Sequence, residues 1–106
     1  MQPEEIRFAR WTMYVGGEPV GLLQLLIADQ PWSTCRFEPL EGWASVRTLF
    51  EVQSQAVLEG FPKDKGWATK EIRQRGVELR PLNDHSGPAI EPSVIYVSGR
   101  EARFRP

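Results

Sequence analysis

Two residue types that often carry chemistry are scarce in this sequence. The chain of 106 residues has one cysteine, Cys35, and one histidine, His85. A lone cysteine excludes an intrachain disulfide, and so few soft ligands argue against a zinc or iron–sulfur site. No glycine-rich phosphate-binding pattern opens a helix. We therefore expect neither a metal nor another cofactor.

Long apolar runs and an excess of one charge are also lacking. Lys and Arg total 13 against 14 Asp and Glu, so the net charge is -1. This balance argues against a dedicated nucleic-acid binder, whose basic patch usually shows in the totals. No run of about eighteen apolar residues indicates a membrane span, and residues 1–5 do not resemble a secretory signal. We expect a cytoplasmic protein.

The first third of the chain predicts three strands. Residues 6–15 are rich in β-branched and aromatic side chains, and Gly16-Gly17 suits a two-residue hairpin turn. That turn predicts that Val15 faces Glu18, Met13 faces Val20 and Trp11 faces Leu22. Residues 20–28 are almost continuously apolar, as in a central strand or a buried helix. The turn signals directly before and after this segment favour the central strand.

The stretch 29–43 links this hairpin to the next element. Residues 29–31 carry turn formers and should reverse the chain. Residues 32–38 then alternate, which predicts a third strand with Cys35 and Phe37 inward and Trp32 and Arg36 on the other face.

The middle of the chain predicts one main helix over residues 44–59. Its apolar stripe, at spacings of three and four, comprises Val46, Leu49, Phe50, Gln53, Ala56 and Val57. Ser45 is the expected N-cap, and Gly60 the expected C-cap. Residues 67–75 predict a shorter second helix with Trp67, Ala68 and Ile72 towards the core.

The last third predicts further strands. Residues 77–80 alternate and end at Pro81, which suits an edge strand. Residues 83–88 are turn formers, and residues 94–97 and 102–105 predict a hairpin. The whole is therefore one α+β domain, residues 1–106: three strands, one or two helices and two or three strands, with a mostly antiparallel sheet of five or six strands packed on one main helix.

Four segments resemble one protein family: residues 14–21, 29–32, 35–39 and 99–105. They are similar to segments of small uncharacterised bacterial proteins, actinobacterial ones among them, which have no assigned activity. The resemblance covers most of the chain and implies a bacterial origin. Because its motifs are turns and strand ends, it transfers no catalytic residue.

The residues that could catalyse a reaction have structural explanations. His85 stands between Asp84 and Ser86, but neighbours in sequence rarely reach the geometry of a triad. A more specific catalytic hypothesis is a Cys35 thiolate activated by His85, but the inward strand position of Cys35 favours a role as a small core residue. The carboxylates Asp29, Glu38 and Glu41 have local roles in turns and strands. No reaction follows, which favours a role other than catalysis.

The tryptophans are the more informative group. Trp32 and Trp43 flank the third strand and anchor the helix if they are buried. If they are exposed, they form with Arg36 an aromatic and arginine surface typical of binding hot spots. The candidate binding residues are Trp32, Arg36, Trp43, Asp29 and Glu38.

The leading hypothesis is a small interaction module, immunity-like or accessory, that binds a protein partner or forms a homodimer. The alternative is a small-ligand binder or enzyme whose pocket lies between sheet and helix, with Asp29, Arg36, Glu38 or His85 as its polar groups. Arg100, Arg103, Phe104 and Arg105 could stack single-stranded nucleic acid, but the charge balance disfavours that function.

Overall fold

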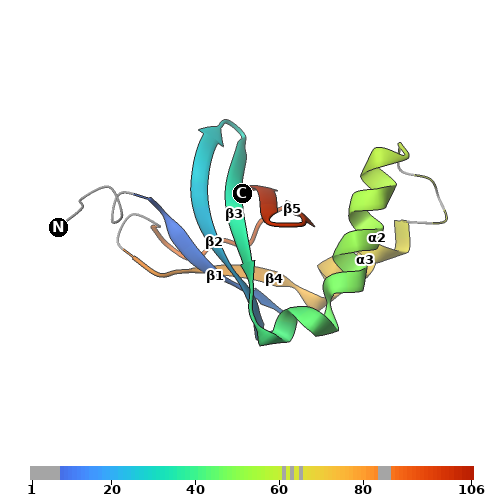
Figure 1. Ribbon diagram of the computed structural model, residues 1–106, viewed down its shortest axis with the longest axis horizontal. Coiled ribbons are helices and arrows are strands. Elements are labelled where there is room, and N and C mark those ends of the chain that lie inside the picture. Colours follow the sequence, from blue (N-terminus) through green and yellow to red (C-terminus); the bar gives the residue numbers. More distant parts are fainter. Residues whose placement is uncertain (1–7, 61, 63, 65, 84–86) are drawn as a thin grey trace.

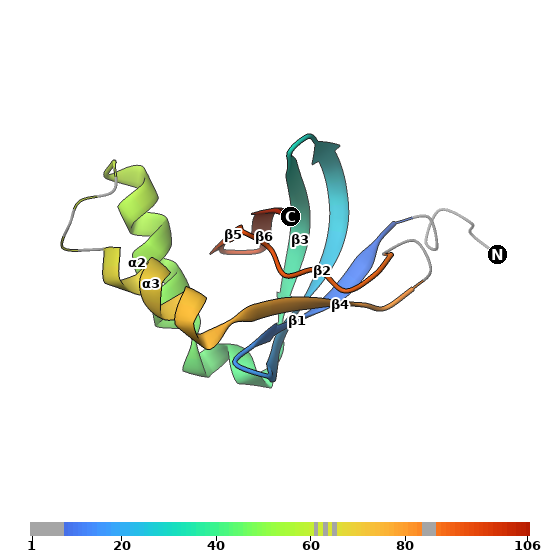
Figure 2. The ribbon, with the colours of Figure 1, turned by 180° about the vertical axis from the view of Figure 1, so that it is seen from behind.

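The fold is seen in a computed structural model that describes residues 8–60, 62, 64, 66–83 and 87–106. Over these residues, six antiparallel strands form one sheet in the order β4-β1-β2-β3-β6-β5. The strands are β1 (Arg10–Val15), β2 (Glu18–Asp29), β3 (Trp32–Pro39), β4 (Val77–Pro81), β5 (Val94–Ser98) and β6 (Glu101–Arg105). The sheet curls into a half-barrel beside the helices, so the predicted α+β class is confirmed (Figures 1 and 2).

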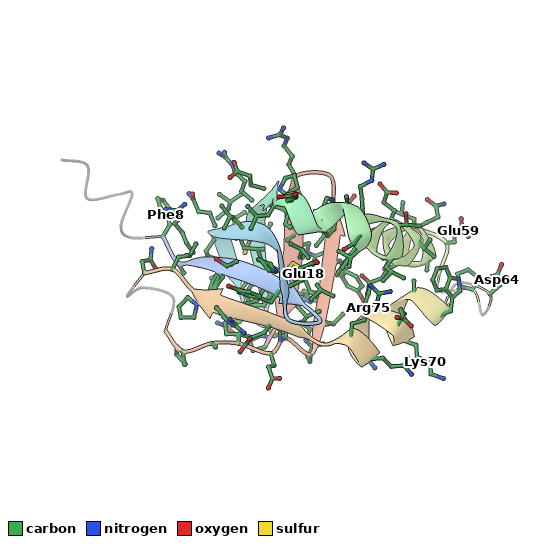
Figure 3. All side chains as sticks on the ribbon, turned by 90° about the horizontal axis from the view of Figure 1, so that it is seen from below. Phe8, Glu18, Glu59, Asp64, Lys70 and Arg75 are labelled. Atoms are coloured by element: carbon green, nitrogen blue, oxygen red, sulfur yellow. The ribbon has the colours of Figure 1, made fainter. Side chains whose placement is uncertain are left out.

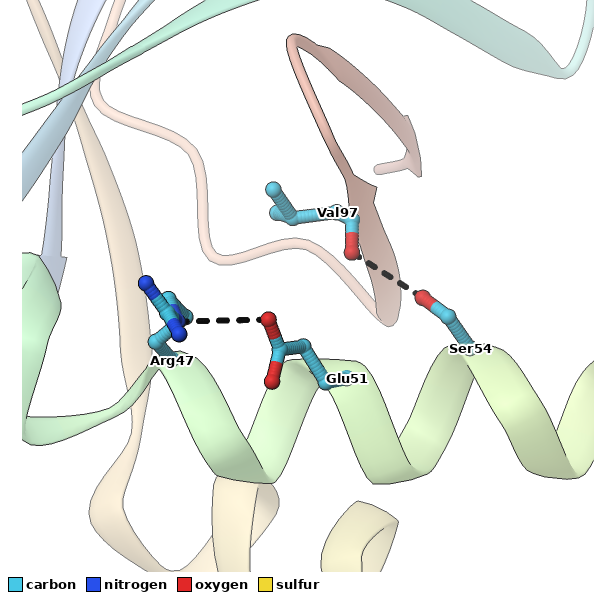
Figure 4. A network of polar contacts seen from close by, with 4 residues as sticks. All are labelled: Arg47, Glu51, Ser54 and Val97. Atoms are coloured by element: carbon cyan, nitrogen blue, oxygen red, sulfur yellow. Dashed lines mark hydrogen bonds and ion pairs between the residues drawn. The ribbon is translucent and has the colours of Figure 1, made fainter.

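The helices gather at one end of the curled sheet (Figure 1). They are a 3-10 turn, η1 (Glu41–Ser45), and two α-helices, α2 (Arg47–Leu58) and α3 (Gly66–Arg75). The Ser54 hydroxyl donates a 2.9 Å hydrogen bond to the Val97 carbonyl, which ties α2 to β5 (Figure 4). Charged side chains such as Lys70 extend away from the helices (Figure 3).

The start of the main helix differs from the prediction. Ser45 does not cap α2, because its hydroxyl donates to the Gly42 carbonyl at 2.8 Å and thereby closes η1. Val46 precedes α2 and provides no side-chain cap. The end agrees with the sequence: Gly60 follows α2 with a φ of 76°, the left-handed conformation in which glycine carries no side-chain penalty.

The core fills the concave side of the sheet. Alternate residues of β1, β3 and β6 point inward, as strand geometry requires, and meet the buried stripe of α2. Each large side chain that becomes fully buried stabilises the fold by about 1.5–3 kcal/mol. The largest fully buried side chains include Phe37, Phe50, Phe104, Met13, Leu23 and Leu79. The inward positions predicted for Cys35 and Phe37 are thus confirmed.

A β-bulge alters the predicted hairpin register. Val15 pairs with Glu18 as expected, but Met13 pairs with Gly21 and Trp11 with Leu23, because the register shifts between Met13 and Tyr14. Val20 and Leu23 are an odd number of residues apart, so a regular strand would place them on opposite faces. The extra residue allows both to be buried.

Two side chains predicted to face the core are exposed. Val57 is 37% exposed and Trp67 is 51% exposed. The buried positions of α3 are Ala68 and Ile72, which are four residues apart and form a narrow stripe. Trp67 and Val57 each lie one residue beside a buried stripe, about 100° around the helix, and therefore point towards solvent.

Candidate functional site

The outer, convex face of the sheet carries the first group of candidate residues. Cys35 and Phe37 are buried inside, whereas Trp32 is half-buried and Arg36 and Glu38 are exposed. This alternation confirms the predicted facing of β3. Asp29 pairs with Trp32 at the tip of the β2–β3 hairpin, so four of the five predicted binding residues lie on or beside this face.

The centre of the outer face is a group of side chains that we call the Trp32 patch: Trp32, Tyr96, Arg103 and Arg105. The Trp32 ring stacks on the Tyr96 ring with centroids 6.0 Å apart and planes 24° apart. The guanidinium carbons of Arg103 and Arg105 lie 4.7 Å and 5.7 Å from the centroid of the Trp32 ring. Two cations therefore rest on one aromatic stack.

Strand register explains why these residues meet. Thr34 of β3 pairs with Arg103 of β6, which in turn pairs with Tyr96 of β5. Trp32 is two residues from Thr34, on the same face, so Arg103 is its diagonal neighbour. The patch thus combines three adjacent strands, of which β3 is far in the sequence from the β5–β6 hairpin.

Arg103 and Arg105 form no ion pair within the described part of the chain. Ion pairs there join Arg47 to Glu51, Arg75 to Glu71 and Arg80 to Glu78, and none includes Arg103 or Arg105 (the first is drawn in Figure 4). A cation above an indole ring gains about 0.5–1 kcal/mol at an exposed site. That contact leaves the N–H donors of both guanidinium groups available for a carboxylate or phosphate.

A groove of about 180 Å³ borders the Trp32 patch. One wall is α2, through Ser54, Val57 and Leu58, and the other is the β5–β6 hairpin. Leu58 is 81% exposed. The hairpin contributes Tyr96, Ser98, Glu101 and Arg103. The groove and the patch therefore share an aromatic ring and a guanidinium group.

Arg36 lies apart from the patch on the same face. It is four residues from Trp32, which is about 13 Å along a strand. Arg36 lines a shallow depression with Arg10, Gln24 and Glu38, and it pairs in register with Glu101. The structure therefore places Arg36 and Trp32 on one surface without joining them in one contact.

Trp43 is the one candidate binding residue that does not lie on or beside the outer face. Its ring centroid lies 4.7 Å from that of Phe37 and 5.3 Å from that of Phe50, and the residue packs against the core cluster. Trp43 reaches this position because η1 turns the chain inward after β3. Of the two positions that the sequence allowed for Trp43, the structure shows the one against the core, on the opposite side of the sheet from Trp32 and Arg36.

No protein-family model, curated protein or solved structure matches this chain. The resemblance to bacterial proteins thus stays a prediction.

The chemistry of Cys35 does not suit a nucleophile. Its side chain has no exposed area, and burial raises the pKa of the thiol from 9.0 to about 12. The thiol, and not the reactive thiolate, is then the form present at neutral pH. His85, its predicted partner, lies outside the described residues.

The described residues contain no group of three or more His, Cys, Asp or Glu side chains that could hold a metal ion. A search of the same residues finds no helix long and apolar enough to cross a membrane.

A pocket of about 220 Å³ lies between the helices and the segment that leads into β5. Asp29, Arg36 and Glu38 do not line it. Its lining includes Gln53, Thr69, Arg73, Glu91 and Ile95. The Gln53 amide nitrogen donates to the Thr69 hydroxyl at 3.3 Å, while its buried amide oxygen has no partner among the described residues.

Proposed function

We propose that the chain is a cytoplasmic protein-binding module whose contact surface is the Trp32 patch and whose partner presents acidic side chains there. The observation that supports this function is the pair of guanidinium groups, Arg103 and Arg105, which lie over the Trp32 ring of the Trp32–Tyr96 stack and form no ion pair in the described structure. Tryptophan, tyrosine and arginine are the residue types that dominate binding hot spots. The stack also pre-orders the arginine side chains, which lowers the entropic cost of binding.

A protein partner suits this surface better than nucleic acid does. A nucleic-acid strand needs a continuous track of cations for successive phosphates. On the outer face, Glu101 stands beside Arg36 in register, and Glu38 follows on β3, so carboxylates interrupt the cations. An acidic contact centred between Arg103 and Arg105 lies farther along β6 than Glu101, which is two residues before Arg103 and four before Arg105.

A second copy of the chain also suits the patch poorly. A two-fold dimer would place the patch against itself. Arg103 and Arg105 of both copies would then meet, and like charges across an interface oppose association. The homodimer predicted from the sequence is therefore not what we propose for this face.

The proposal is tested with a charge-reversed variant, Arg103→Glu/Arg105→Glu. Proteins captured by the immobilised wild-type chain are purified, and their affinities are measured directly for the wild-type chain, this variant and Trp32→Ala. We expect each change to weaken binding at least tenfold, and the wild-type affinity to fall as salt rises. Arg100→Glu, in the exposed turn between β5 and β6, is the matched control. Equal affinities for all of these chains would show that the patch does not bind the partner.

A second candidate function is small-ligand binding in the pocket beside Gln53. The observation that favours it is a buried amide oxygen with no partner in the described structure, since such groups are rare in native proteins. A ligand with a hydrogen-bond donor would satisfy that oxygen after a small movement of the side chain. We expect such a ligand, found by a thermal-shift screen of metabolites, to raise the unfolding midpoint of the wild type and not of Gln53→Met.

A further inference from the structure

One wall of the groove beside the Trp32 patch consists of apolar side chains that are exposed to solvent. Leu58 and Val57 are 81% and 37% exposed at the C-terminal end of α2, opposite the Tyr96 ring. Ser54, on the same wall, already donates its hydroxyl to Val97 within the fold and needs no ligand. Ser98, Glu101 and Arg103 supply the polar groups of the opposite wall, and the α2 wall offers a partner mainly apolar surface.

The size of the groove suits one side chain. A cavity of about 150 Å³ lined by apolar side chains admits a benzene ring, and the groove measures about 180 Å³. An aliphatic or aromatic side chain placed there would cover Leu58 and contact Tyr96.

The groove is directly continuous with the cationic patch. Arg103 lines the groove and also lies above the Trp32 ring, while Tyr96 lines the groove and stacks on Trp32. A single bound segment can therefore place an apolar side chain against Leu58 and a carboxylate against Arg103. Because Leu58 and Arg103 line the same groove, these two side chains would lie close together in the bound segment.

We infer that the partner is recognised through a short linear peptide segment, in which an apolar anchor enters the groove next to an acidic residue bound by Arg103. This inference rests on the proposed function and specifies the partner's chemistry. The apolar anchor supplies specificity, because an acidic segment without it would leave Leu58 exposed. Arg105 provides a second contact for acidic residues beyond the first.

The test begins with a random-peptide library displayed on phage and selected on the immobilised full chain. Selected peptides are synthesised with a fluorescent label, and their affinities are measured by anisotropy for the wild type, Arg103→Gln and Leu58→Gln. Because Leu58 is so exposed, Leu58→Gln keeps the fold, which circular dichroism checks. Leu82→Gln is the matched control, since Leu82 is 50% exposed and lies beyond β4, away from the groove.

We expect the selected peptides to share an apolar residue at a constant short spacing from an acidic one. Arg103→Gln and Leu58→Gln should each weaken binding about tenfold, which corresponds to 1.4 kcal/mol, and Leu82→Gln should not. Replacing the apolar peptide residue by serine should weaken binding to the wild type, but hardly weaken binding to Leu58→Gln any further.

Each of the other outcomes would contradict a different claim: the role of the groove, the peptide nature of the partner, or the patch as the binding site. If Arg103→Gln weakens binding and Leu58→Gln does not, the groove inference is wrong while the proposed function stands. If no peptide is selected, the peptide inference is wrong. If peptides bind independently of Arg103, the patch itself is not the site. If an oligothymidylate displaces the peptides at equal concentration, the site prefers nucleic acid and the choice of a peptide partner is wrong.

Discussion

The Trp32 ring lies stacked on the Tyr96 ring, 6.0 Å away between centroids, on the convex face of the sheet. Trp43 packs instead between Phe37 and Phe50 on the concave side. Two tryptophans that flank the same strand therefore have different roles, one at the surface and one at the edge of the core.

This division predicts different costs for removing each ring. Trp43→Ala should lower the free energy of unfolding by about 3 kcal/mol, because it leaves a cavity beside two phenylalanines. Trp32→Ala should lower it by about 1 kcal/mol or less, because only surface stacking and cation–π contacts are lost. Urea unfolding followed by far-ultraviolet circular dichroism measures both values. Equal losses would contradict the assignment of the two rings to different faces.

Gly21 carries a second prediction. A Cβ atom at this position would lie 2.2 Å from Cε1 of Phe37, whose ring is fully buried and cannot move outward. Gly21→Ala should therefore destabilise the fold by about 1–3 kcal/mol through overpacking. The control is Gly66→Ala at the start of α3, where an added Cβ meets no atom within 4 Å. That variant should be neutral or slightly more stable, and a Gly21→Ala protein as stable as wild type would show that Phe37 can repack.

Much of this fold was predictable because alternation within a strand is a local property. The pattern around Cys35 showed which residues of β3 face inward, and therefore that Trp32 and Arg36 share the other face. The position of Trp43 was not predictable, because it lies four residues after Pro39 in a short 3-10 turn that has no periodic pattern.

The Trp32 patch as a set could not be read from the sequence. Tyr96 and Arg103 reach Trp32 only because β6 pairs with β3 and β5 pairs with β6, and strand order is a property of the whole fold. The alternation of Arg103 and Arg105 around Phe104 was the one sequence pattern that indicated a shared face for the two arginines. Phe104 itself is buried on the other face. The pocket near Gln53 likewise depends on how the helices meet the segment before β5.

Cys35 predicts a pH dependence of stability. Burial raises the pKa of its thiol from 9.0 to about 12, so the folded chain keeps the proton at a pH where the unfolded chain loses it. The unfolded state then binds fewer protons, and stability falls as pH rises from about 9 towards 12. Relative to Cys35→Ala, the wild type should lose about 1 kcal/mol between pH 9 and pH 10.

Denaturant titrations of both proteins at each pH measure this difference, and the comparison with Cys35→Ala removes the contribution of other titrating groups. In a parallel experiment at neutral pH, iodoacetamide should alkylate Cys35 only after denaturation. Rapid alkylation of the folded protein would show that the thiol is accessible, and would revive the nucleophile hypothesis.

Gln53 provides the last prediction. Its side chain is 2% exposed, its nitrogen donates to Thr69, and its oxygen has no partner within the described residues. An orphaned buried acceptor costs about 1–3 kcal/mol, which offsets the benefit of the single hydrogen bond. Gln53→Met keeps the volume and removes the orphan, so its free energy of unfolding should equal or exceed that of wild type by up to about 1 kcal/mol. Gln53→Ala, which also removes the volume, should lower the free energy of unfolding by about 2 kcal/mol.

If Gln53→Met lowers the free energy of unfolding as much as Gln53→Ala does, the Gln53 oxygen has a stabilising partner such as a buried water. The orphaned oxygen would then no longer support a ligand in the adjacent pocket.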